Sequence, residues 1–403
     1  MGRKTHHAGG PLIANPNIAV TSKNNRPAEL PALTSLRGLA ALAVLLFHSS
    51  SLALIYAGGV SSGGTLVWIW SRGYLAVDLF FFLSGFVLTH VYGSQFAEDR
   101  SWRAVGRFLW ARFCRIYPAS LFATAVFVLA FTVGRLPFPT NASFVEQLIS
   151  SLSLMQVPWL DTVLLNPLSW SISAEFYAYL LFPFIVPLIL RLSRRLGTVL
   201  CVTLLIAIVV GGRGFSHIDQ TSGWVALFRA LPEFTVGILA YRSYSARLFR
   251  KIWEMDATLI GVIAMIITAG FAGISDGLII MLLLVLLLAS VCNTGRMAGF
   301  LDTRPLRWLG EVSYSVYIFQ TLPLMLMVSF SGVLVAHGLG GSRFAAIAAL
   351  LALGGGVLVY RCVDLPVRAA LRRLPDRVVA FTAAYRGAET RLVPLMRAPE
   401  RDR

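Results

Sequence analysis

The sequence predicts an all-α protein that crosses a membrane about ten times and has both termini in the cytoplasm. Three observations support this fold class. Apolar residues make up 57% of the 403-residue chain and charged residues 13%, whereas soluble globular chains carry roughly 25% charged residues. The apolar residues form long runs, and the basic residues gather in alternate connections between those runs. This composition excludes a disordered chain, a coiled coil and a small disulfide scaffold.

Each predicted span is an apolar run of about the length that a membrane requires. A helix needs about 20 mostly apolar residues to cross a hydrocarbon core roughly 30 Å thick. Runs of this length exceed what the core of a soluble enzyme uses, so a soluble multidomain protein is not expected. In chain order, the predicted spans are residues 38–57, 74–92, 116–134, 170–190, 196–212, 224–241, 257–274, 278–293, 309–331 and 344–363.

The basic residues give these spans a direction. The N-terminal segment, the even-numbered connections and the C-terminal tail hold 30 Lys and Arg residues, whereas the opposite connections hold 4. Connections rich in Lys and Arg stay in the cytoplasm, which predicts that both termini are cytoplasmic. Residues 141–160 are moderately apolar but contain Glu146 and Gln147. They are expected to form a re-entrant or interfacial segment on the outer side, because a further span would break the alternation.

The chain divides into a polar cytoplasmic N-terminal segment (residues 1–33), a membrane domain (residues 34–366) and a basic cytoplasmic tail (residues 367–403). The tail is expected to lie on the anionic inner leaflet. No cleavable signal peptide is expected, because the first apolar run begins late in the chain. The net charge of +16 is distributed in short clusters between apolar runs, so no nucleic-acid partner is expected. The four scattered Cys predict neither a metal site nor a disulfide framework.

Ionisable side chains inside spans are costly in lipid, so each is a candidate functional residue. Arg37 lies at the cytoplasmic mouth of the first span, and His48 follows eleven residues later. This spacing is a rise of about 16 Å, which brings His48 near the midplane of the bilayer. Eleven helical steps of about 100° return to nearly the same face, so Arg37 and His48 line one stripe. His48 is therefore a candidate general base, and the alternative is a buried structural histidine.

The next positions also have a structural and a functional interpretation. Arg112 and Arg115 begin the third span, where they either anchor the helix at the interface or bind an anion through their guanidinium groups. Asp78 in the second span and Glu175 in the fourth are each expected to pair with a buried Arg or to orient a His.

Three further positions favour structural interpretations. Arg229 and Glu233 lie four residues apart on one predicted helix, which favours an ion pair between them. His90 is near the inner interface and is expected to be a polar anchor. Glu311 is near a helix end, where it is expected to cap or pair locally.

Six motifs follow one another along the chain. They are LRGLAALAVLLFH at residues 36–48, VDLFFFLSGF at 77–86, FLWARFCRIYP at 108–118, WSISAEFY at 170–177, RALPEFTVG at 229–237 and LGEVSYSVY at 309–317. In this order they resemble acyltransferase family 3, the multispan bacterial O-acyltransferases that modify surface polysaccharides, lipopolysaccharide and similar acceptors. The resemblance covers residues 33 to about 368.

The resemblance implies a multi-pass protein of the bacterial inner membrane. It implies that an acyl-CoA, usually acetyl-CoA, is the donor on the cytoplasmic side, and that a hydroxyl of a glycan or lipid-linked glycan is the acceptor. It assigns catalytic roles to His48, Arg37 and the acidic Glu175, and it maps the family's R-x-x-R pair onto Arg112 and Arg115. These two arginines are expected to bind the CoA phosphates, and Arg37 is a further candidate for this role. No bound cofactor and no metal are expected.

The expected chemistry leaves two routes open. His48 either deprotonates the acceptor hydroxyl or transiently carries the acyl group. An Arg, Tyr177 or Tyr317 is expected to stabilise the developing oxyanion. Two positions depart from the family pattern: Gln320 stands where many members have a His, and Asp364 begins the final acidic-x-Pro motif.

Two other function classes compete with the acyltransferase hypothesis. A transporter or flippase of a glycolipid or polysaccharide shares the helix count, but it predicts broken spans and inverted repeats, and the sequence shows neither. A non-catalytic membrane scaffold predicts that the histidine and arginines are dispensable.

Overall fold

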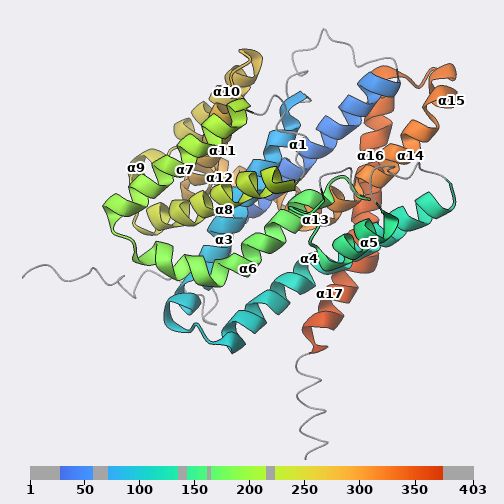
Figure 1. Ribbon diagram of the computed structural model, residues 1–403. Helices are drawn as coiled ribbons and strands as arrows, with labels where there is room; N and C mark the ends of the chain where they lie inside the picture. Colours follow the sequence, from blue (N-terminus) through green and yellow to red (C-terminus); the bar gives the residue numbers. More distant parts are fainter. Residues whose placement is uncertain (1–27, 58–70, 135–142, 161–164, 215–222, 375–403) are drawn as a thin grey trace, which may run out of the picture.

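The computed structural model describes residues 28–57, 71–134, 143–160, 165–214 and 223–374. Most of the predicted N-terminal segment and most of the predicted basic tail lie outside the described residues. Within the described residues the structure is a bundle of α-helices (Figure 1).

Seven helical units among the described residues are long and apolar enough to cross a membrane, which makes the chain a multi-pass membrane protein. They are α1 (Pro31–Tyr56), η2 with α3 (Gly73–Leu75 and Ala76–Glu98), α4 (Trp102–Thr132), α6 (Ser169–Arg191), α7 (Arg194–Gly214), α8 (Gly223–Ser245), and α16 (Gly341–Val359) with its extension. The extension consists of the π-helical turn η3 (Tyr360–Asp364) and α17 (Leu365–Arg372).

The predicted number of about ten spans is not confirmed, although every predicted apolar run falls on a helix. An eighth span results if α13 (Arg304–Phe319) and α14 (Thr321–Ser329), which are bent by 48°, count as one. The remaining two runs form α10 (Asp256–Phe271) and α11 (Asp276–Cys292). Their 16 and 17 residues span about 24–26 Å, which is less than a hydrocarbon core of about 30 Å.

Four short helices complete the described structure. They are α5 (Phe144–Ser153), α9 (Arg250–Trp253), α12 (Arg296–Leu301) and α15 (Ser331–Ala336). The ten residues of α5 are too few to cross a membrane, so residues 143–160 contain no further complete span.

The helix that contains the predicted third span begins well before that span. The helix begins at Trp102 rather than at residue 116, because Ser101 caps it by accepting a hydrogen bond from the backbone amide of Ala104 at 3.2 Å. Arg112 and Arg115 therefore lie within α4, whose 31 residues rise about 46 Å. This helix is longer than the membrane core is thick. Its first turns still pack within the bundle, where Ala104 and Phe108 are 0% and 1% exposed.

The break between α13 and α14 was not expected, although a proline signals it. The ring of Pro323 cannot accommodate the carbonyl of Phe319 four residues earlier, so α13 ends there. Side chains bind two nearby carbonyls: Gln320 Nε2 donates to the carbonyl of Tyr317 at 3.2 Å, and Asn166 Nδ2 donates to that of Ile318 at 2.8 Å.

Two pairs of helices pack backbone against backbone through glycine. A Cβ atom on Gly85 of α3 would overlap the carbonyl oxygen of Phe234 on α8, and a Cβ on Gly237 of α8 would overlap that of Phe82 on α3. In α1, a Cβ on Gly38 would lie 2.6 Å from the amide nitrogen of Gly310 on α13. Small residues permit this close approach of membrane helices, which brings the walls of the site together.

The end of the bundle where α1 begins, α3 ends, α4 begins and α17 ends is called the basic end below. It is the predicted cytoplasmic end, and this orientation stays a prediction. In Figure 1, α16 and α17 form one nearly continuous rod that reaches the basic end beside α4.

Candidate active site

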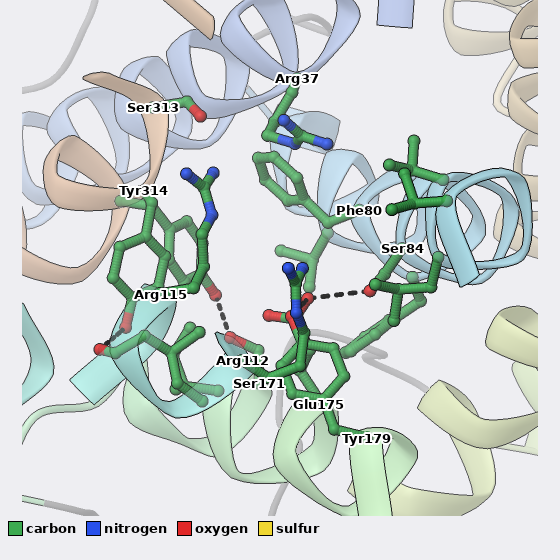
Figure 2. Close-up of a pocket in the computed structure, with 18 of the residues that line it drawn as sticks. Arg37, Phe80, Ser84, Arg112, Arg115, Ser171, Glu175, Tyr179, Ser313 and Tyr314 are labelled. Atoms are coloured by element: carbon green, nitrogen blue, oxygen red, sulfur yellow. Dashed lines mark hydrogen bonds between the residues drawn. The ribbon is translucent and has the colours of Figure 1, made fainter. Parts of the chain in front are cut away.

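A cavity of about 310 Å³ lies among α1, α3, α4, α6, α13 and α17 (Figure 2). Its size is at the lower end of the range of small-molecule sites, which is roughly 300–1,000 Å³. The lining residues named by the sequence prediction are Arg37, Arg112, Arg115, Glu175 and Tyr317. Residues far apart in the chain therefore meet at one cavity.

Four arginines line the cavity, three of them on α1 and α4 and the fourth, Arg372, on α17. Arg37 reaches it from α1, and Arg112 and Arg115 reach it from α4 (Figure 2). No described carboxylate oxygen lies within 4 Å of the nitrogens of these guanidinium groups. Three positive charges without a paired carboxylate favour the binding of an anion, such as phosphate, over a purely structural role.

Arg112 is held in place by an aromatic neighbour. Its Nη2 donates to the hydroxyl of Tyr92 at 3.1 Å, and its guanidinium carbon lies 5.3 Å from the centre of the Tyr92 ring. Its Nε is buried and has no hydrogen-bond partner in the described structure. A buried donor without a partner is costly, so a ligand that accepts a hydrogen bond from the Arg112 guanidinium would be favoured.

Glu175 is the carboxylate that the described residues contribute to the cavity wall. The sequence predicted that it pairs with an Arg or orients a His, but the structure shows neither contact. Instead its Oε1 accepts hydrogen bonds from Ser84 at 2.9 Å and from Tyr179 at 2.5 Å (Figure 2). Sequence reasoning missed both hydroxyl groups, although Tyr179 follows Glu175 by one helical turn and therefore shares its face.

The end of the cavity farthest from Tyr92 along α3 combines apolar side chains with hydroxyl groups. Val77 and Phe80 line it from α3, and the rings of Phe80 and Tyr317 meet edge to face with centroids 5.7 Å apart. The hydroxyl groups of Tyr317 and Ser171 are 2.7 Å apart and share a hydrogen bond. Tyr317 is therefore positioned at the cavity, as the sequence predicted for an oxyanion-stabilising residue.

Behind this wall lies a buried ion pair, which corrects one sequence prediction. Arg229 donates from Nε and Nη2 to the two carboxylate oxygens of Asp78, both at 2.7 Å. The partner of Arg229 is thus Asp78 on the neighbouring helix and not Glu233 on its own helix. The close contact of α3 with α8 brings the Asp78 carboxylate within reach, and the Arg229 guanidinium also lies 5.4 Å from the Trp170 ring. Glu233 is fully buried beside the pair.

His48 does not line the cavity. Its Nδ1 lies 3.0 Å from the carbonyl oxygen of Val44, one turn earlier on α1. A carbonyl only accepts, so Nδ1 carries the proton and Nε2 is the atom that can accept one. Val44 is fully buried in the same apolar cluster as Val77 and Phe81. Arg37, which was predicted to share a helical stripe with His48, does line the cavity.

The other predicted positions lie away from the cavity. The hydroxyl of Tyr177 accepts from Trp159 Nε1 at 3.0 Å, outside the cavity wall. His90 Nε2 lies 2.9 Å from the carbonyl oxygen of Ala28, as an anchor would. Glu311 is exposed.

A second group of residues that the sequence did not indicate organises the basic end of the cavity. Asp364 is fully buried and accepts from Ser315 at 3.2 Å and from Arg368, one turn later. Arg368 also donates to the carbonyl of Arg115 at 3.5 Å, which ties α17 to α4. A further turn along α17, Arg372 lines the cavity. The sequence pattern that could have revealed this group is an acidic residue followed at four-residue intervals by two arginines.

Comparisons with known proteins agree with these features. The sequence model of a family described as an acyltransferase domain, acyltransferase family 3, matches residues 30–361. Acyltransferase MdmB of Streptomyces mycarofaciens is 34% identical over 175 residues, which are 42% of each chain. O-acetyltransferase OatA of Staphylococcus aureus (strain NCTC 8325 / PS 47) is 23% identical over 93% of this chain and 62% of its own length. The matched regions thus span less than two thirds of these relatives. No solved structure matches the chain significantly.

Proposed function

The chain belongs to acyltransferase family 3, and from this premise we propose that it transfers an acyl group, acetyl in the simplest case, from acyl-CoA to a hydroxyl group. The proposed acceptor is an exported polysaccharide, lipopolysaccharide or lipo-oligosaccharide. The proposed location is the bacterial inner membrane, with the basic end facing the cytoplasm, where acyl-CoA is available.

The observation that carries this proposal is the group of arginines without paired carboxylates at the basic end. A CoA ester carries phosphate groups at one end and the thioester at the other. Arg112 and Arg115 suit the phosphates, because guanidinium groups bind phosphate oxygens in a bidentate manner. Arg372 is available at the same end of the cavity.

The shape of the cavity supports an extended donor. Residues of α3 line it from Tyr92 to Val77, a rise of about 22 Å along the helix. Arg112 lines the cavity beside Tyr92, whereas Val77, Phe80 and the hydroxyl groups of Ser171 and Tyr317 line it toward the other end. A linear donor with its phosphates at the arginines and a short acyl group near Phe80 fits this arrangement.

The proposed reaction is attack of an acceptor oxygen on the thioester carbonyl. Nε2 of His48 takes the hydroxyl proton, the C–S bond breaks, and CoA leaves as a thiol once its sulfur is protonated. In the alternative route His48 first carries the acyl group. Tyr317 or Arg37 would stabilise the oxyanion, since both lie at the cavity. The acceptor would approach His48 from the end opposite the basic end, because His48 does not line the cavity that takes the donor.

A transporter of a glycolipid or polysaccharide is the second candidate, and one observation favours it. Broken membrane helices are typical of transporter sites, and α13 and α14 form a span bent by 48° at the fully buried Gln320. Acyl transfer from labelled acyl-CoA separates the two functions, since transport requires no CoA ester.

The test is acetylation of surface glycan in a strain that lacks the gene, complemented with single variants. Arg115→Gln is expected to raise the KM for acetyl-CoA roughly 10- to 150-fold, because a hydrogen bond to a charged group contributes about 1.5–3 kcal/mol. The matched control is Arg103→Gln, an exposed arginine of the same helix that does not line the cavity. His48→Gln is expected to bind acetyl-CoA but to transfer nothing.

Two outcomes would overturn the proposal. If the wild-type protein moves glycan across the membrane without acetylating it, the chain is a transporter. If Arg115→Gln and Arg103→Gln have the same KM, the arginines do not bind the donor.

A further inference from the structure

Two aromatic side chains line the part of the cavity that is farthest from Tyr92 along α3. Phe80 lines the cavity and is half-buried, so part of its ring faces the empty volume. The edge of this ring meets Tyr317, which approaches from α13. The two rings therefore form part of this wall from two helices.

Tyr317 cannot easily move aside. Its side chain is 4% exposed, and its hydroxyl shares a hydrogen bond with Ser171 at 2.7 Å. Trp170, the neighbour of Ser171, stacks under Arg229, which is held by both oxygens of Asp78. The wall behind Phe80 is thus held by polar contacts among α3, α6, α8 and α13.

Phe80 is the adjustable part of this wall. Phe81 and Val77, its neighbours on α3, are 2% and 5% exposed and belong to the packed core. All three residues line the cavity, but Phe80 is the least buried of them, so shortening Phe80 extends the cavity with less loss of core packing than shortening Val77 or Phe81.

We propose that Phe80 limits the length of the acyl group that the enzyme accepts, so that short acyl-CoA esters are the donors and longer ones are excluded. This inference rests on the proposed function. It follows because the half-buried Phe80 ring stands in the cavity wall at the end where the acyl chain would lie. A longer chain would have to displace that ring or the fixed Tyr317 behind it.

The experiment compares transfer from acetyl-, butyryl- and octanoyl-CoA by purified protein in lipid nanodiscs. Phe80→Ala is expected to raise the ratio of kcat/KM for octanoyl-CoA over acetyl-CoA by at least about 10-fold, since one methylene in an apolar pocket changes discrimination by roughly 10- to 200-fold. Phe80→Trp is expected to shift the ratio of butyryl- over acetyl-CoA in the opposite direction. The control is Val87→Ala, which also lines the cavity from α3 but lies two turns nearer the basic end.

Each outcome decides the inference. An unchanged chain-length ratio in both Phe80 variants, alongside normal acetyl transfer by the wild-type protein, overturns the role of Phe80 and leaves the proposed function intact. Equal use of octanoyl- and acetyl-CoA by the wild-type protein overturns it as well. If the wild-type protein transfers no acyl group from any CoA ester, the proposed function itself fails. Opposite shifts in the Ala and Trp variants support the inference, because misfolding would lower all three activities together.

Discussion

Replacing Arg229 with Met removes the positive charge that faces two buried carboxyl groups. Asp78 and Glu233 are both 0% exposed, and Arg229 holds both oxygens of Asp78 at 2.7 Å. Removing one partner of a buried ion pair costs about 3–5 kcal/mol, because the remaining charge stays in a medium of low polarity. We therefore expect Arg229→Met to lower the free energy of unfolding by about this amount.

Asp78→Asn is expected to be milder. The Asn side chain keeps one oxygen that can accept from Arg229, and the Glu233 carboxyl group remains nearby to offset the guanidinium charge. The loss is then one buried hydrogen bond and part of the charge interaction, or about 1–3 kcal/mol. The double variant Asp78→Asn, Arg229→Met leaves one buried carboxyl group instead of two, so it should be more stable than Arg229→Met alone.

The measurement is thermal unfolding of the solubilised protein, followed by size-exclusion chromatography with fluorescence detection. The control is Arg250→Met, which breaks the Arg250–Glu254 pair on α9, where the arginine side chain is 52% exposed. A surface pair of this kind contributes about 0–1 kcal/mol. The reasoning is refuted if Arg229→Met unfolds at the same temperature as Asp78→Asn, or if the second substitution lowers stability further.

Two more predictions concern helix packing and donor binding. Gly85→Ala places a methyl group against the carbonyl of Phe234 and should lower the free energy of unfolding by about 1–3 kcal/mol. The control is Gly106→Ala, which has open space around it and should be neutral. Equal unfolding temperatures for the two variants would contradict the close packing of α3 on α8. Arg372→Gln should raise the KM for acetyl-CoA about 10-fold, with kcat unchanged. The wild-type protein is expected to prefer acetyl-CoA over the same donor without the 3′-phosphate, and the variant should lose that preference. The neighbouring Arg373→Gln is the control, and a fall in kcat alone would place Arg372 outside the binding site.

The positions of the helices were predictable because hydropathy is a local property of the chain. All ten predicted apolar runs fall on helices, and the resemblance to acyltransferase family 3 is confirmed. The number of spans was not predictable in the same way. It depends on where a helix starts, as Ser101 sets for α4, and on whether a run bends, as it does before Pro323.

The candidate site was predicted as a set of residues but not as an arrangement. Arg37, Arg112, Arg115 and Glu175 were identified individually, because charges are rare and costly within membrane spans. Their meeting at one cavity is visible only in the structure. Whether His48 acts as a base stays a prediction, since the structure places it beyond the cavity wall.

By itself, then, the sequence determined which segments are helical, which residues are expensive to bury, and which family the motifs resemble. Only the tertiary structure decided which charges are neighbours. Arg229 pairs with Asp78 because glycine contacts bring α3 and α8 together, and Ser84 of α3 binds Glu175 of α6 because both face the same cavity. The physical reason is that hydropathy and helix propensity act within a few turns of one chain segment. The partner of a buried charge, in contrast, is set by the packing of helices that are distant in the sequence.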